Sequence, residues 1–179
     1  TQHYAMLRKS NSAQDSQISY FVGNPGSYVY PTSDRPVQNP GGNCASTADS
    51  WSYGLQNLPP YGNGQGSTSS IASRYYGRNI MYALGLDDNE GGDSHCEAQY
   101  QGTSHLTRGQ NFQRELQSAN GGNVPSSQQF NYVPNVAHED YLIFSDPNSQ
   151  QFLFAQGANF AASASSTASK SGATWAASS

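Results

Sequence analysis

The sequence predicts an α/β fold in which helices cover a parallel sheet, and three observations support this prediction. Short apolar runs with β-forming residues recur along the chain, at residues 18–22, 79–84 and 130–133. Segments with helical spacing alternate with these runs, and such an order is typical of parallel sheets with helices on both faces. The length of 179 residues is enough for one domain with a hydrophobic core.

Each predicted strand is bounded by turn or loop sequence. Residues 18–22 read ISYFV and stop at residues 23–26, whose sequence GNPG is a strong turn signal. Residues 79–84 (NIMYAL) end at Gly85, and residues 130–133 (FNYV) lead into a polar loop. We therefore expect three short strands.

The segments around these strands are predicted to be helical. The longest is residues 103–118, where Leu106, Phe112 and Leu116 are expected to face inward and two glycines follow as a stop signal. The other helical segments are residues 1–9, 70–76, 141–144 and 151–154.

Two segments lack such periodicity. Residues 27–70 form a long excursion with many prolines and aromatic residues, which predicts either a functional loop, such as a lid or binding wall, or a surface insertion. Residues 158–179 are dominated by Ala and Ser, which predicts a disordered tail or linker and a candidate for O-glycosylation. We expect the folded domain to span residues 1–157.

The composition favours a secreted, extracellular protein. Charged residues make up only 11% of the chain, and Ser, Gly, Asn and Tyr take their place. The formal net charge is −4 and no run of Lys or Arg occurs, so we expect no nucleic-acid partner. No stretch approaches the ~20 apolar residues of a membrane helix. The chain starts at Thr1 without a signal-peptide pattern, so we expect that a preceding segment was removed or is missing.

The two cysteines, Cys44 and Cys96, lie in polar, glycine-rich sequence. In an oxidising compartment they could form a disulfide that closes a loop of roughly 50 residues and contributes roughly 4 kcal/mol in the chain-entropy model. Two unpaired buried thiols are the alternative, and the disulfide is favoured. Neither cysteine has the neighbours that a metal site needs, and the sequence implies no metal or cofactor.

Acidic and histidine side chains follow two of the predicted strands. Asp87 and Asp88 come just after residues 79–84, and His138 comes just after residues 130–133. The carboxyl ends of parallel strands meet at one edge of a sheet, where ligands bind. An acid followed along the chain by a histidine matches the second and third members of the Ser–Asp–His triad of α/β hydrolases. The carboxylate would orient the imidazole, which would take the nucleophile's proton.

Several strings resemble those of secreted microbial and fungal α/β-hydrolase-like proteins, in the same order over residues 1–157. They are YFVGNPGSYVY (20–30) with DRP (34–36), WSYGL (51–55) with LPPY (58–61), YALGLDD (82–88), CEAQYQG (96–102) with HLTRG (105–109), and VPNVAH (133–138). The first is similar to a VVANPSSYLY…RP stretch of that family and the third to YLLGTAD. The resemblance implies the C-terminal half of an α/β-hydrolase parallel sheet, with flanking helices and a long loop excursion.

The resemblance also implies roles for particular residues. It places the triad acid at Asp88, with Asp87 as the close alternative, and the base at His138. The turn after the first strand is implied to line the edge near the site, with binding residues Asn24, Ser27 and Tyr28.

The nucleophile of such a triad is missing from the sequence. No G-x-S-x-G string occurs, and in the resembling family the nucleophile elbow stands just before a helix, which residues 1–9 would continue. The serine would then lie upstream of Thr1. Half of a parallel sheet also leaves an open edge strand. We therefore expect an N-terminal segment or a companion chain that completes the sheet.

Two functions from different classes follow from these features. The first is a secreted serine hydrolase that cleaves a small-molecule ester or amide by acyl transfer. The second is a non-catalytic extracellular, cell-wall or assembly-forming protein on the same scaffold. Two weaker alternatives are a carbohydrate-binding surface made by Trp51, Tyr53 and Tyr61, and a calcium site in residues 87–93, whose spacing is not that of an EF-hand.

Overall fold

The computed structural model describes residues 1–9, 15 and 17–155, so the predicted tail at residues 158–179 lies outside the described residues. Three strands form one parallel sheet in the order β1 (Ser19–Gly23), β2 (Asn79–Gly85) and β3 (Gln128–Val133). This confirms the predicted α/β class and the three predicted strands. Within the described part of the chain, β1 and β3 are the edges of the sheet.

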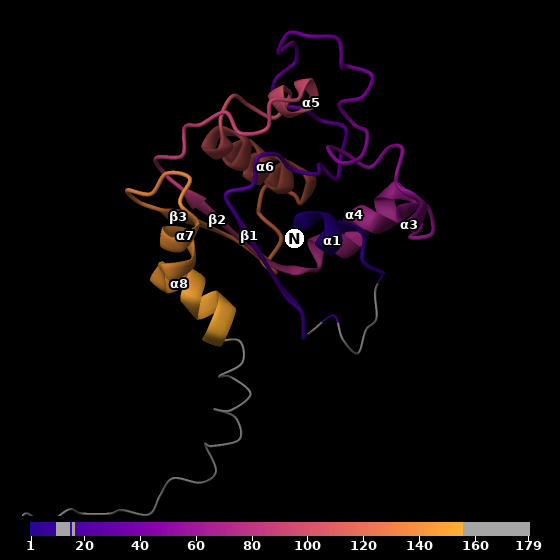
Figure 1. Ribbon diagram of the computed structural model, residues 1–179. Helices are drawn as coiled ribbons and strands as arrows, with labels where there is room; N and C mark the ends of the chain where they lie inside the picture. Colours follow the sequence, from indigo (N-terminus) through magenta and orange to yellow (C-terminus); the bar gives the residue numbers. More distant parts are fainter. Residues whose placement is uncertain (10–14, 16, 156–179) are drawn as a thin grey trace, which may run out of the picture.

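Helices lie on both faces of this sheet (Figure 1). On one face are α1 (Gln2–Leu7), α4 (Thr68–Tyr76) and α6 (His105–Ala119). On the other are α7 (Asp140–Ser145), α8 (Pro147–Gln150) and a π-helical turn at Gln151–Ala155. Two short helices, α3 (Pro60–Asn63) and α5 (Cys96–Gln99), lie in the loops.

The side chains of the strands alternate between two hydrophobic cores, as the pleat of a strand requires. Ile80 and Tyr82 of β2 face the larger core, where the ring of Phe112 from α6 meets that of Tyr82 edge-on at 5.6 Å. Ala83 of β2 faces the smaller core with Ile143 of α7. Both faces of β2 are thus buried, which is typical of the central strand of a covered parallel sheet.

In the first turn of α6, the buried residue is not the one predicted. Phe112 and Leu116 are fully buried as expected, but Leu106 is only half-buried and His105 is buried in its place. The side chain of Ser104 caps the helix by accepting a hydrogen bond from the backbone N–H of Thr107 at 3.2 Å, so His105 becomes the first helical residue. The first turn packs against polar loops at the end of the sheet, and polar side chains therefore face inward there.

The predicted helical segments at residues 141–144 and 151–154 correspond to α7 and the π-helical turn, and the short helix α8, which was not predicted, begins between them after Asp146. The side chain of Asp146 accepts hydrogen bonds from the backbone N–H groups of Asn148 and Ser149, both at 3.0 Å. Pro147, which has no N–H to donate, then occupies the first position of α8.

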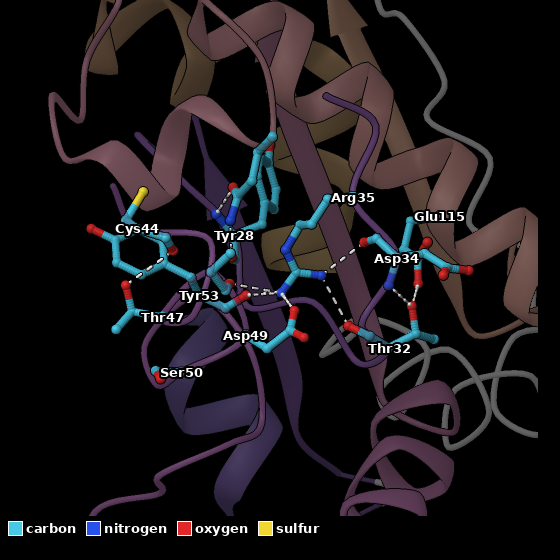
Figure 2. Close-up of polar contacts among 12 residues, drawn as sticks. Tyr28, Thr32, Asp34, Arg35, Cys44, Thr47, Asp49, Ser50, Tyr53 and Glu115 are labelled. Carbon is cyan, nitrogen blue, oxygen red and sulfur yellow. Dashed lines mark hydrogen bonds and ion pairs between the residues drawn. The ribbon is translucent and has the colours of Figure 1, made fainter. Parts of the chain in front are cut away.

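The excursion at residues 27–70 is packed onto the domain and organised by the buried Arg35 (Figure 2). The guanidinium of Arg35 pairs with Asp49 at 2.7 Å and lies over the ring of Tyr30, with 4.6 Å between its carbon and the ring centroid. It also donates hydrogen bonds to the backbone carbonyl groups of Thr32, Asp34, Ala48 and Tyr53. One buried cation thus ties together several separate parts of the loop.

Most aromatic residues of the excursion are buried or half-buried, whereas Tyr61 is 57% exposed. Trp51 packs against the larger core, and the hydroxyl of Tyr53 donates to the carboxylate of Asp93 at 3.0 Å. These contacts favour a structural role for the two rings over a carbohydrate-stacking surface.

The predicted disulfide between Cys44 and Cys96 is present, with 5.9 Å between the Cα atoms. It joins the excursion to the first residue of α5. Among the described residues, no helix has the length and apolar character that a membrane span requires.

Candidate functional site

Asp88 and His138 meet at the edge of the sheet where β2 and β3 end. Oδ2 of Asp88 lies 2.9 Å from Nδ1 of His138. The side chain of Asp88 is only 1% exposed, whereas that of His138 is 41% exposed. A buried carboxylate therefore faces an imidazole whose other side remains open to solvent.

Asp87, the alternative acid, lies differently. Its side chain is exposed, and its backbone N–H donates to the carbonyl oxygen of Val136 at 2.9 Å. The backbone of Asp87 thus helps to hold the loop that carries His138, while the carboxylate next to the imidazole belongs to Asp88.

A second imidazole, which the sequence analysis did not select, binds the other oxygen of the same carboxylate. Nδ1 of His105 lies 2.8 Å from Oδ1 of Asp88, and the side chain of His105 is 5% exposed. The two imidazole rings stack, with 4.3 Å between their centroids and an interplanar angle of 19°. The sequence placed His105 in a helical context without a role. The cap at Ser104 is the local signal that puts residue 105 at the start of α6.

Asn24 connects the ends of the strands beneath this site. Its side-chain oxygen accepts a hydrogen bond from the N–H of Gly85 at 2.8 Å, and its side-chain nitrogen donates to the carbonyl oxygen of Ala137 at 3.1 Å. The backbone of Asn24 has a φ of 36°, a region that Asn tolerates better than most residues. One amide thus links the end of β1, the end of β2 and the segment that precedes His138.

Gly85 lets the loop after β3 approach the end of β2. A Cβ atom at this position would collide with the backbone carbonyl oxygens of Val136 and Ala137. The N–H of Leu86 also donates to the carbonyl oxygen of Val133 at 2.9 Å. This close backbone packing delivers His138 to the carboxylate of Asp88.

Comparison with known proteins identifies the architecture. No protein-family model matches the chain, and no curated protein sequence matches it significantly. Among solved structures, it is similar to poly(aspartic acid) hydrolase-1 from Sphingomonas sp. KT-1, with a TM-score of 0.56 and 20% identity over 87% of this chain and 48% of that one. The chain has an α/β-hydrolase fold.

A second solved structure is less similar. It is LpqC, a poly(3-hydroxybutyrate) depolymerase from Bordetella parapertussis, with a TM-score of 0.46 and 18% identity over 80% of this chain and 40% of that one. The chain thus spans about half the length of the first of these proteins and less of the second.

The turn that was predicted to line the edge of the α/β-hydrolase sheet does so only in part. Ser27 donates its hydroxyl hydrogen to Oδ2 of Asp93 at 2.8 Å. Tyr28 is completely buried and stacks on Phe112, with 4.6 Å between the ring centroids. The prediction that Tyr28 is a binding residue is therefore wrong, because its ring is not accessible. After the turn the chain re-enters the core, and the ring of Tyr28 is covered there.

Asp93 anchors the loop between β2 and α5 near the site. Its carboxylate accepts hydrogen bonds from Ser27, from the hydroxyl of Tyr53, and from both the backbone N–H and the ring of His95. The completely buried Arg108 holds the backbone nearby by donating to the carbonyl oxygens of Gly26, Asp93 and Gly102. Since the carboxylates of Asp88 and Asp93 both face N–H and O–H donors, the calcium alternative is not favoured.

Asp88, His105 and His138 also have the residue types of a metal site. Their candidate ligand atoms all lie within 4.8 Å of one another. At 2.8 and 2.9 Å, however, the two Nδ1 atoms are at hydrogen-bonding distance from a carboxylate, which can only accept. Each Nδ1 therefore carries a hydrogen and is not available to a cation in this arrangement.

The stability of the fold is expected to decrease as Asp93 is protonated, between about pH 4 and pH 2. Burial raises the pKa of Asp93, but hydrogen bonds from the N–H and ring of His95, from Ser27 and from Tyr53 outweigh it and lower the pKa from 3.8 to about 2. Because the folded state has the lower pKa, its stabilisation is present above about pH 4 and is lost as the pH falls through about 2.

The measurement is urea unfolding at several pH values in this range for the wild type and Asp93→Asn. The wild type should lose stability more steeply than the variant as the pH falls. Parallel curves for the two proteins would contradict the prediction.

Proposed function

We propose that this chain is the part of a secreted serine hydrolase that carries the triad acid, Asp88, and the base, His138. The observation that supports this most directly is the 2.9 Å contact between the buried carboxylate and the half-exposed imidazole at the carboxyl edge of an α/β-hydrolase sheet. With its Nδ1 hydrogen donated to Asp88, His138 keeps an unprotonated Nε2 that can accept a proton.

The proposed reaction is acyl transfer from an ester or amide. Nε2 of His138 takes the hydroxyl proton of the nucleophilic serine as its oxygen attacks the carbonyl carbon, and Asp88 stabilises the resulting imidazolium. The imidazolium then gives this proton to the alcohol or amine as its bond to the carbonyl carbon breaks. The alcohol or amine departs, and the acyl group remains on the serine as an acyl-enzyme. Water then gives a proton to His138 as its oxygen attacks the acyl carbon. The ester bond to the serine breaks, the imidazolium returns the proton to the serine oxygen, and the carboxylic acid is released.

The proposal includes a further segment, N-terminal to Thr1 or on a companion chain, that supplies the serine and pairs with β1. Within the described residues β1 is an edge strand. A groove of about 450 Å³ lies beside it, with Phe21, Phe144 and Phe152 in its wall. An open edge strand beside a groove lined partly by aromatic side chains is consistent with a surface that another segment covers.

Extracellular localisation is part of the same proposal. The Cys44–Cys96 disulfide supports it, because disulfides persist in oxidising compartments and are rare in the cytosol. The low content of charged residues, 11%, is also consistent with a secreted protein.

Exposed acidic residues near the pair favour an uncharged substrate. Three of them, Asp87, Glu90 and Glu139, lie on the loops that carry Asp88 and His138, and a fourth, Asp140, begins α7. Their negative potential would repel a polyanion. We therefore do not extend to this chain the substrate named for the Sphingomonas protein, poly(aspartic acid).

The test is covalent labelling by an uncharged fluorophosphonate ester, which reacts with activated serines. The full-length gene product should be labelled, and the 179-residue chain alone should not. His138→Gln in the full-length protein should reduce the labelling rate by at least about 10³-fold, because the serine loses its base. His95→Gln, which changes another exposed histidine, serves as the matched control and should label at the wild-type rate.

A folded full-length protein that resists labelling would exclude the enzymatic proposal. The remaining interpretation would then be a non-catalytic extracellular protein on the same scaffold.

A further inference from the structure

We propose that His105 is a positioning residue, which holds the carboxylate of Asp88 in the rotation that presents Oδ2 to His138. This inference rests on the proposed hydrolytic role of Asp88 and His138. It assigns different tasks to the two histidines that share one carboxylate.

The first argument is the division of the two oxygens. His105 donates to Oδ1 at 2.8 Å and His138 donates to Oδ2 at 2.9 Å, so each oxygen has its own N–H partner. The terminal torsion of an Asp side chain is otherwise broad, and a carboxylate with one partner can turn. A hydrogen bond to an ionised group is about twice as strong as a neutral one, which makes the N–H of His105 an effective stop to that rotation.

The second argument is that His105 is poorly placed to act as the base. Its side chain is 5% exposed, against 41% for His138. Nε2 of His105 faces the backbone of Gly92, which has a φ of 58°, and a Cβ atom at Gly92 would overlap this nitrogen. The far edge of the ring is thus closed by the chain, whereas His138 is open.

The third argument is the rigidity of the element that carries His105. It is the first residue of α6, a helix of 15 residues capped by Ser104. Its backbone N–H donates to the carbonyl oxygen of Glu90 at 2.9 Å, and the next residue, Leu106, donates to that of Asp88 at 3.1 Å. His138, in contrast, lies on a loop. A helix-borne group therefore sets the orientation of the acid, and the acid sets the orientation of the loop-borne base.

The competing explanation is that His105 acts only by stacking on His138, at 4.3 Å between centroids. Two substitutions separate the hydrogen bond from the stacking. His105→Asn keeps an N–H donor near the position of Nδ1 and removes the ring. His105→Phe keeps a ring of similar size that can stack and removes the donor.

Both variants are made in the full-length protein, with an uncharged ester as substrate. His105→Phe should lower kcat by about 10- to 100-fold with little change in KM, as expected when a hydrogen bond to a charged group is lost. His105→Asn should stay within about threefold of the wild type. Proton NMR of histidine-labelled protein should show a low-field Nδ1–H resonance for His138 in the wild type and His105→Asn. In His105→Phe the same resonance should broaden through faster exchange with water.

The outcomes separate the two proposals. A wild-type protein without esterase activity or phosphonate labelling contradicts the hydrolase, and the NMR comparison still tests the role of His105. An active enzyme in which His105→Phe matches the wild type in kcat and in the His138 resonance overturns the positioning role alone. A loss confined to His105→Asn overturns it in favour of stacking. Loss of the cooperative thermal transition in both variants overturns it as well, because His105 would then be required for the fold.

Discussion

Asp88→Asn should lower kcat of the full-length enzyme by about 10³- to 10⁴-fold. The wild-type carboxylate accepts one N–H from each of two imidazoles. An asparagine offers one oxygen and one NH₂ group, so in either orientation its NH₂ faces an N–H of a histidine. One imidazole must then move its hydrogen from Nδ1 to Nε2.

The surroundings of the two histidines decide which imidazole moves its hydrogen from Nδ1 to Nε2. Nε2 of His105 faces the backbone of Gly92 in a closed space, whereas His138 is 41% exposed and can place a new Nε2 hydrogen toward water. We therefore expect the NH₂ group to face His138. Its Nε2 would then be protonated and could not accept the proton of the serine.

The measurement is the steady-state hydrolysis of an uncharged ester, with Asp87→Asn as the matched control. Asp87 is the adjacent residue, has the same side chain and is exposed, so its substitution should change kcat less than about threefold. A large loss in Asp87→Asn with a near-normal Asp88→Asn would show that the acid had been assigned to the wrong residue.

Removal of the disulfide should have the largest effect on stability, about 4 kcal/mol in the chain-entropy model. The cross-link joins Cys44 and Cys96, which are 52 residues apart. The closed loop contains α3, α4 and the central strand β2, so the unlinked chain would gain much conformational freedom when unfolded. For a domain of this size, we expect a decrease in Tm of about 8–16 °C.

The double variant Cys44→Ser/Cys96→Ser should be compared with the wild type by urea unfolding, each with and without dithiothreitol. The reductant should destabilise the wild type to the level of the variant and leave the variant unchanged. A difference below about 1 kcal/mol between the oxidised wild type and the variant would contradict the prediction.

Local sequence patterns were enough to predict the frame of this protein. Residues 18–22, 79–84 and 130–133 are apolar, β-forming runs, and all three are strands of one parallel sheet. Helix α6 was foreseen from its apolar residues, since burial of Phe112 and Leu116 needs only the helical period. Such features depend on residues close together in the sequence.

The polar contacts of the site were less accessible to sequence analysis. A histidine or acidic residue after a strand predicts the edge at which it lies, but not the direction of its side chain. Tyr28 was placed at the binding edge and is a core residue, because the rotation of the chain after the GNPG turn is set by packing against Phe112. His105 was passed over for a similar reason, since the capping of α6 and the return of the loop from β2 together bring it to Asp88.

The sequence by itself thus determined the class of fold, the order along the chain of the three strands and the longer helices, and the edge of the sheet to which Asp88 and His138 belong. Only the tertiary structure decided that Asp88 rather than Asp87 faces His138, that His105 binds the second oxygen, and that Asn24 links the strand ends. The physical reason is the separation along the sequence of the residues that interact. Strands and helices follow from the periodicity of neighbouring residues, whereas hydrogen bonds join segments that are distant in the sequence and depend on how those segments pack.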